Sequence, residues 1–156
     1  MSDSTSALTQ WLVFRLQSHD YALPIGDVVE VLRMVALTPM PQAPTWLAGV
    51  ANLRGRVIPV IDLRRRLAVG PPETPGLSTP IIVVQARGRT VGLLADSVSE
   101  VLTLADDAIA APDALAGPDH AVEGLARAGG RLILTLDLDR VIAGVSISAD
   151  TDQPSS

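Results

Sequence analysis

The sequence lacks cysteine and lysine altogether and contains only four aromatic residues. Without cysteine, the chain can form neither a disulfide framework nor a thiolate metal site, and we expect a reducing compartment. Without lysine, it cannot form the phosphate-binding loop in which a lysine contacts the terminal phosphates. The net charge of −5 and the scarcity of aromatic side chains argue against a surface that follows phosphates or stacks bases. We therefore expect no nucleic-acid partner.

Catalytic constellations are also missing from the residue inventory. The two histidines, His19 and His120, have no orienting carboxylate at a fixed spacing, and no metal-ligand spacing is present. Asp62 and Asp137 each follow an apolar run, where an aspartate commonly caps the next helix. The sequence predicts no catalytic residue, no cofactor site and no metal site, and hence no enzyme.

The composition is typical of one compact domain. Hydrophobic residues make up 47% of the 156 residues, enough for an aliphatic core, yet no apolar stretch of about 18 residues is present. The first residues have neither a basic segment nor an apolar run after it, so we expect a cytoplasmic protein without direct membrane insertion. Residues 1–10 and 146–156 are predicted to be disordered or flexible.

One stretch, residues 52–64, combines a glycine turn, an apolar strand and a charged end. Gly55 suits a tight turn, and residues 57–61 are β-branched at four of five positions, which favours a buried strand. Pro59 lacks a backbone donor, so we expect this strand to border the rim of a barrel. The arginines 64–66 that follow predict a solvated helix face, or alternatively a docking site for an acidic partner.

The same pattern occurs a second time in the chain. Residues 130–138 align with 55–63 without a gap, conserving the order of glycine, arginine, apolar run and Asp-Leu. Residues 98–102 likewise align with 28–32, and 81–84 with 11–14. The sequence predicts a duplication, with repeats at about 11–69 and 80–145, a proline-rich linker at 70–79, and two small β units packed together within a single domain over 11–145.

The remaining segments predict short elements around these repeats. Hairpins are expected at 11–24, 81–95 and 122–136, and a brief helical turn from Ile25 that passes into a strand near Val31. Residues 45–48 predict one helical turn, and 63–67 and 138–143 predict short helices. Residues 106–121 predict a loop, which lengthens the second repeat.

Residues 41–63 read Pro-x-x-Pro-x-x-Leu-x-Gly-Val-x-Asn-Leu-Arg-Gly-x-Val-Ile-Pro-Val-Ile-Asp-Leu. This stretch resembles the central motif of the CheW family of bacterial chemotaxis adaptors, and residues 92–101 and 130–138 resemble its two later motifs. The resemblance runs from about Trp11 to Val145. It implies an all-β fold of two SH3-like five-stranded β-barrels with short helices.

The resemblance also implies a function without catalysis. Proteins of this family couple the cytoplasmic tip of methyl-accepting chemoreceptors to the regulatory domain of the CheA histidine kinase, at membrane-associated receptor arrays. The resemblance implies a protein interface, with Val28 and Glu30 from the segment at 28–32 and four residues from the central motif: Gly49, Asn52, Arg54 and Gly55. An internal ion pair between Arg54 and Glu30 is the structural alternative, and buried core is the alternative for Val28.

Two other functions stay open at the level of sequence. One is a CheW-like coupling protein of a surface-motility or other chemosensory pathway. The other is a small-molecule-binding β-barrel that uses the groove between the two units, with Asp62 or Asp137 and Arg54 as polar groups.

Overall fold

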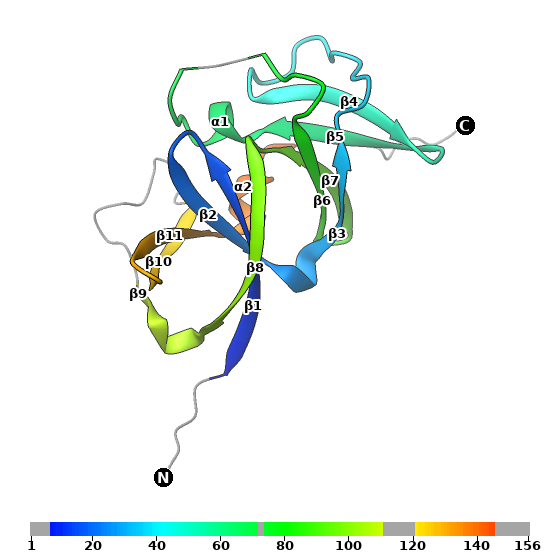
Figure 1. The fold of residues 1–156 in the computed structure, drawn as a ribbon. Helices are drawn as coiled ribbons and strands as arrows, with labels where there is room; N and C mark the ends of the chain where they lie inside the picture. Colours follow the sequence, from blue (N-terminus) through cyan, green and yellow to red (C-terminus); the bar gives the residue numbers. More distant parts are fainter. Residues whose placement is uncertain (1–6, 72–73, 111–120, 146–156) are drawn as a thin grey trace.

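The computed structural model describes residues 7–71, 74–110 and 121–145, and within them the chain is built mainly of β-strands (Figure 1). The strands are β1 (Leu8–Leu16), β2 (His19–Pro24), β3 (Val28–Arg33), β4 (Leu47–Leu53), β5 (Arg56–Asp62), β6 (Pro80–Ala86), β7 (Arg89–Leu94), β8 (Ser97–Ala105), β9 (Ile109–Ala110), β10 (Val122–Ala128) and β11 (Arg131–Leu136). Four short helices accompany them: η1 (Ile25–Asp27), α1 (Leu63–Arg66), η2 (Asp106–Ala108) and α2 (Leu138–Val141). The predicted all-β class is confirmed.

The strands form two curved sheets, which agree with the two expected SH3-like barrels. The first sheet has the order β8-β1-β2-β11-β10-β9, in which β9 has only two residues. The second has the order β3-β6-β7-β5-β4. Figure 1 shows them as two lobes, with β1, β2 and β8 near the middle of the molecule. We call them the β1 barrel and the β3 barrel.

Each barrel takes strands from both repeats of the sequence. The β1 barrel contains β1 and β2 from the first repeat and β8 to β11 from the second, whereas the β3 barrel contains β3 to β5 and then β6 and β7. The exchanged hairpins join their new sheets through parallel pairs, β2 with β11 and β5 with β7. A repeat of the sequence therefore does not correspond to one barrel, and the chain crosses between barrels after β2 and again after β7.

In the described residues, two-residue turns with two successive positive φ angles close three hairpins, at Arg54-Gly55, Arg87-Gly88 and Gly129-Gly130. Arg54 and Gly55 have φ angles of 53° and 86°, and Gly129 and Gly130 have 58° and 80°. Two successive positive φ angles match the right-handed twist of the flanking strands, and this is the reason such turns favour glycine. The predicted hairpins across Arg54-Gly55 and Gly129-Gly130 are confirmed.

The buried side chains form three clusters. The largest lies between the two sheets and combines, among others, Phe14 and Leu23 of the β1 barrel with Ile61 and Leu93 of the β3 barrel. Each barrel also has an interior cluster of six buried residues, with Val13 and Ile133 in one and Ile58 and Val83 in the other. Because the largest cluster lies between the barrels, neither sheet buries its apolar faces alone.

Two sequence-based expectations are wrong. Residues 45–48 do not form a helical turn, because β4 starts at Leu47 and the chain there pairs with β5. β5 is not an edge strand, since β4 and β7 pair with it on either side. Pro59 is tolerated for a local reason: the parallel pairing with β7 begins only at Val60, so the missing N–H of Pro59 costs no hydrogen bond to β7.

The expectation of a solvated arginine face on α1 is also wrong. The Arg64 side chain is 12% exposed and forms an ion pair with Asp96, and Arg66 donates to main-chain carbonyls of α2. Only Arg65 has a largely open side chain, at 44% exposure. The helices predicted at 63–67 and 138–143 are both present and begin where expected, but α1 ends at Arg66 and α2 at Val141.

The helices of the described segments are all short. None of them has the length and apolar composition that crossing a membrane requires. The predicted loop at 106–121 starts with η2 and β9, and its residues 111–120 lie outside the described part of the chain, as do His120 and the two tails at 1–6 and 146–156.

Candidate functional site

The structure brings together two of the predicted site residues, Glu30 of β3 and Arg54 of the β4–β5 turn. Arg54 Nη1 donates to Glu30 Oε2 at 2.5 Å, and Arg54 Nη2 donates to Glu30 Oε1 at 2.8 Å. Two parallel N–H to oxygen bonds form the planar fork that arginine makes with a carboxylate. β3 and β4 are the two edge strands of their sheet, so this ion pair joins the two edges of the curved β3 barrel.

The pair is open to solvent on its arginine side. The side chain of Arg54 is 70% exposed and that of Glu30 is 28% exposed. The hydrogen bonds from Arg54 lower the pKa of Glu30, and the same bonds raise the pKa of Arg54. Both groups are therefore charged at neutral pH. Because solvent screens an exposed pair, it contributes little to stability, and the guanidinium remains accessible to another protein.

Arg54 occupies a backbone conformation that non-glycine residues rarely adopt. Its φ angle is 53°, in the left-handed region. The Asn52 side chain braces the turn, since its Oδ1 accepts a hydrogen bond from the Gly55 N–H at 3.0 Å. Asn52 and Gly55 therefore shape the turn, and Arg54 is presented at its tip.

The other two predicted residues serve the packing around this turn. Gly49 is buried, and a Cβ there would lie 2.7 Å from the Thr38 carbonyl oxygen. Val28 is half-buried and packs against the cluster between the sheets. The Val28 side chain thus lies partly in the core, which was the structural alternative for this residue. Gly49 has no side chain that could contact a partner.

Sequence reasoning missed the exposed valines on the strands that carry the ion pair. Val29 and Val31 of β3 are 55% and 43% exposed, and Val57 of β5 is 55% exposed. Single exposed apolar side chains are common on protein surfaces, and only a contiguous apolar patch marks a contact site. The signal available in the sequence was the run 28–32, where an alternating strand with valine at every second position must leave one apolar face outside.

A similar arrangement occurs in the β1 barrel. Arg131 Nη2 donates to Glu100 Oε2 at 2.5 Å, and these residues align with Arg56 and Glu30. The duplication therefore keeps the glutamate but takes the arginine from a different position, because Gly129 stands where the first repeat has Arg54. Of the two aligned turns, only the β4–β5 turn has an arginine at its tip, because the β10–β11 turn has Gly129 there.

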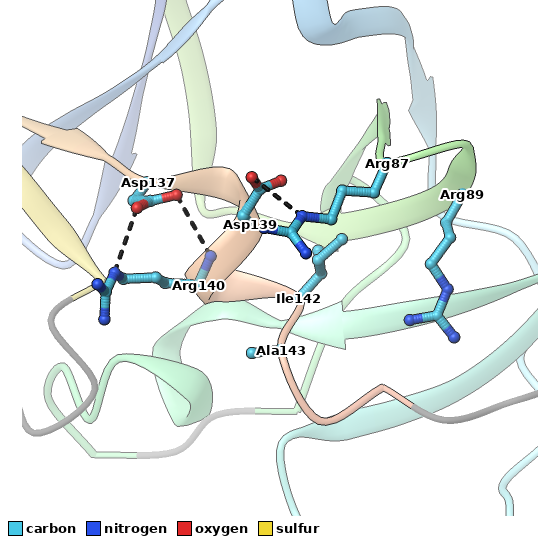
Figure 2. A pocket seen from close by; sticks show the side chains of 7 residues that line it. All are labelled: Arg87, Arg89, Asp137, Asp139, Arg140, Ile142 and Ala143. Atoms are coloured by element: carbon cyan, nitrogen blue, oxygen red, sulfur yellow. Dashed lines mark hydrogen bonds and ion pairs between the residues drawn. The ribbon is translucent and has the colours of Figure 1, made fainter.

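The polar groups of the small-molecule alternative do not line a common cavity among the two cavities described at α2. Asp62 caps α1, where its carboxylate accepts from the Arg64 N–H, and Asp137 caps α2 in the same way. Two cavities of about 400 and 360 Å³ lie at α2 and the β6–β7 turn; Asp137 lines both, and Arg54 and Asp62 line neither. Figure 2 shows that Asp137 and Asp139 there already pair with Arg140 and Arg87.

The described residues do not form a cluster suited to catalysis or metal binding. His19 is exposed at the start of β2. Within residues 7–71, 74–110 and 121–145, no group of three histidine, cysteine, aspartate or glutamate residues could hold a metal ion. The site is thus a protein surface made of an exposed ion pair on a braced turn, with exposed valines on the same strands.

A family model described as the CheW-like domain matches residues 10–146. The chain belongs to the CheW family. A chemotaxis protein CheW of Rhizobium meliloti (strain 1021) is 36% identical over 139 residues, which cover 88% of this chain and 89% of that protein. The chemotaxis protein CheW of Thermotoga maritima is 30% identical over 136 residues, covering 87% and 89%.

The fold comparison agrees with the sequence comparison. The crystal structure of the scaffolding protein TtCheW from Thermoanaerobacter tengcongensis matches with a TM-score of 0.81 and 34% identity, covering 88% of this chain and 94% of that one. The resemblance inferred from residues 41–63 is thereby confirmed for nearly the whole CheW-like domain. The match to the scaffolding protein TtCheW also supports the assignment to a family of scaffolds.

Proposed function

We propose that this protein is a chemotaxis adaptor that couples methyl-accepting chemoreceptors to a CheA-type histidine kinase and catalyses no reaction. The observation that carries the proposal is the match to the CheW-like domain over residues 10–146. The protein would act in the cytoplasm and reach the membrane only through the receptors, at their cytoplasmic tips. Its kinase contact would be the regulatory domain of the kinase.

The exposed guanidinium of Arg54 supports a direct role in partner binding. An arginine that is 70% exposed and held by a bidentate bond keeps free N–H donors in a fixed orientation. Exposed arginines beside apolar side chains are frequent anchors of protein interfaces. We infer that the Arg54–Glu30 pair, which the β4–β5 turn presents to solvent, belongs to the surface that binds a partner.

Co-sedimentation of purified components tests the adaptor function. The receptor cytoplasmic fragment is anchored on vesicles, and the kinase is added with and without this protein. The adaptor proposal expects the kinase to sediment with the vesicles, and its autophosphorylation to change, only when this protein is present. Kinase recruitment that does not depend on this protein would contradict the proposal.

A charge exchange separates a direct contact of Arg54 from an internal brace. Arg54→Glu is expected to leave the fold intact and to weaken binding of a partner, because it repels Glu30 and removes the donor. In the double variant Arg54→Glu with Glu30→Arg, the internal pair can form again in reverse. If Arg54 itself contacts the partner, the exchange does not restore binding.

The equivalent pair of the β1 barrel offers a matched control. Arg131→Glu repels Glu100 as Arg54→Glu repels Glu30, and it also repels Asp20, whose Oδ2 lies 3.8 Å from Arg131 Nε. It therefore gives an upper limit on the cost of breaking such a pair without changing the tip of the β4–β5 turn. Circular dichroism and thermal melting show whether each variant folds. Full binding by the charge-exchanged variant would show that the pair is only structural.

A further inference from the structure

The two outer arginines of α1 make contacts that cross from one barrel to the other. α1 follows β5 of the β3 barrel, whereas Asp96 lies where the chain enters β8 of the β1 barrel. Arg64 Nε donates to Asp96 Oδ1 at 2.8 Å, and Arg64 Nη2 donates to Asp96 Oδ2 at 2.6 Å. A bidentate pair of this kind fixes the relative orientation of the two groups as well as their distance.

Asp96 is itself fixed to the β1 barrel. Its N–H donates to the Arg15 carbonyl at 2.9 Å, and its Oδ2 accepts from the Gln17 N–H at 2.7 Å. Burial alone would raise the pKa of Asp96, but the hydrogen bonds from Arg64 and Gln17 and the charge of Arg64 together lower it. The carboxylate is therefore charged at neutral pH and joins β1 and the β1–β2 turn to α1.

Arg66 makes the second set of crossing contacts. Its Nε donates to the Val141 carbonyl at 2.8 Å and its Nη2 to the Arg140 carbonyl at 2.6 Å. These carbonyls belong to the last residues of α2, which follows β11 of the β1 barrel. The Arg140 carbonyl also accepts from the Ala143 N–H at 3.3 Å, so Arg66 adds to the hydrogen bonds at the end of this helix. The guanidinium also stacks on Trp46 at 5.1 Å from the ring centroid.

The opposite crossover between the barrels has a more exposed ion pair, in which Arg87 of the β6–β7 turn lies 3.2 Å from Asp139 of α2. The duplication aligns Asp139 of α2 with Arg64 of α1. Asp139 and Asp27 line the same cavity of about 360 Å³ beside that crossover. Burial raises the pKa of Asp27, and the charge of Asp139 raises it further. The Arg64–Asp96 pair is bidentate and its side chains are 12% and 28% exposed, whereas the side chains of Arg87 and Asp139 are 74% and 47% exposed and Asp139 also repels Asp27. The stronger crossing contact therefore lies on the side of α1.

We propose that Arg64 and Arg66 are positioning residues that fix the relative orientation of the two barrels. The apolar cluster between the sheets holds the barrels together, but apolar contact is not directional. The crossing hydrogen bonds supply the direction. In the adaptor, a fixed barrel orientation would also fix how two bound partners are oriented relative to each other. This functional half of the proposal rests on the proposed function.

Distances between spin labels on the two barrels test the clamp in the full chain. The chain has no native cysteine, so Arg33→Cys on β3 and Arg127→Cys on β10 can be labelled at exposed positions without further changes. Pulsed electron–electron double resonance then measures the distance distribution between the labels in three variants: Arg64→Gln, Arg66→Gln and the double variant. Arg65→Gln is the matched control, because Arg65 lies between them and contacts only the Asp62 cap among the contacts described.

The proposal expects a broader or shifted distance distribution in the variants at 64 and 66 and an unchanged one in the control. Asp96→Asn removes the partner of Arg64 while leaving α1 intact, so it must broaden the distribution as well, even if the double variant does not fold. A distribution as narrow as that of the Arg65→Gln protein in all of these variants would overturn the clamp.

Binding measurements then separate the functional half of the proposal. Each folded variant is tested for binding to the receptor fragment alone, to the kinase alone, and for kinase activation in the mixture of all three. The functional half is supported if the affinity of a variant for each partner alone stays within about twofold of that of the unaltered protein while kinase activation in the mixture is lost. Unchanged activation despite a broadened distribution overturns that half. If the unaltered protein binds neither partner, the proposed function fails and the clamp is decided by the distances alone.

Discussion

Gly49→Ala is expected to destabilise the protein through a close approach of two main-chain segments. Gly49 has a φ angle of 149°, and an added Cβ would lie 2.7 Å from the Thr38 carbonyl oxygen and 3.3 Å from the Leu37 Cβ. The neighbouring Val50 exchanges two hydrogen bonds of 2.9 Å with Thr38. The methyl group would push residues 37–38 away from β4 and weaken both bonds.

The magnitude follows from these contacts. Each hydrogen bond contributes about 1 kcal/mol net, and the strained backbone conformation adds about 1 kcal/mol for a residue with a Cβ. The lower entropy of alanine in the unfolded chain offsets about 0.5 kcal/mol. We expect a net loss of about 2 to 3 kcal/mol, and for a chain of this length a fall in Tm of about 5 to 10 °C.

Urea denaturation followed by tryptophan fluorescence measures the free energy of unfolding of this variant. Gly26→Ala is the matched control, since no heavy atom lies within 4 Å of a Cβ at that position and its φ is not positive. We expect the control to change the free energy of unfolding by less than about 0.5 kcal/mol. A loss below about 1 kcal/mol for Gly49→Ala would refute the close-approach argument.

Two further substitutions probe single contacts. Asp27→Asn is expected to raise Tm at pH 7 and to leave it unchanged near pH 3. Burial and the charge of Asp139 raise the pKa of Asp27 in the folded state. The folded protein therefore loses stability as the pH rises above the ordinary aspartate pKa, and asparagine avoids this loss. Thermal melts across that range check this, and an equal effect at both pH values would contradict it. Asp62→Ala removes the N-cap of α1, whose carboxylate accepts from the Arg64 N–H at 3.1 Å, and should cost about 1 kcal/mol in chemical denaturation. A neutral result would mean that the cap contributes nothing.

Local features of the fold could be predicted from the sequence because short-range chemistry determines them. The dipeptides Arg54-Gly55 and Gly129-Gly130 indicate two-residue turns, and each lies between apolar runs, so the hairpins follow. Asp62 and Asp137 follow strands directly and cap the next helix, as expected of aspartate in that position. The family motif indicated the β4–β5 turn of the candidate site for the same reason, since Asn52, Arg54 and Gly55 are close together in the sequence, whereas Glu30 lies outside that motif.

Part of the candidate site depended on contacts between distant residues. The pairing of Arg54 with Glu30 was one of two interpretations, because sequence spacing does not show whether the two edges of a sheet meet. The exposure of Val57 could not be predicted either: it begins an apolar run whose other members are buried. Whether an apolar strand residue faces the core depends on the sheet that forms around it.

The sequence by itself determined the all-β class, the duplication and the family, because periodicity, turn residues and a contiguous motif are properties of neighbouring residues. Only the tertiary structure decided which strands share a barrel, since the parallel pairs of β2 with β11 and β5 with β7 join segments far apart in the chain. It also decided the use of Arg64 and Arg66, which a run of charges in sequence indicates as solvated. Their partners lie on the other barrel, and long-range packing alone brings them within hydrogen-bond distance.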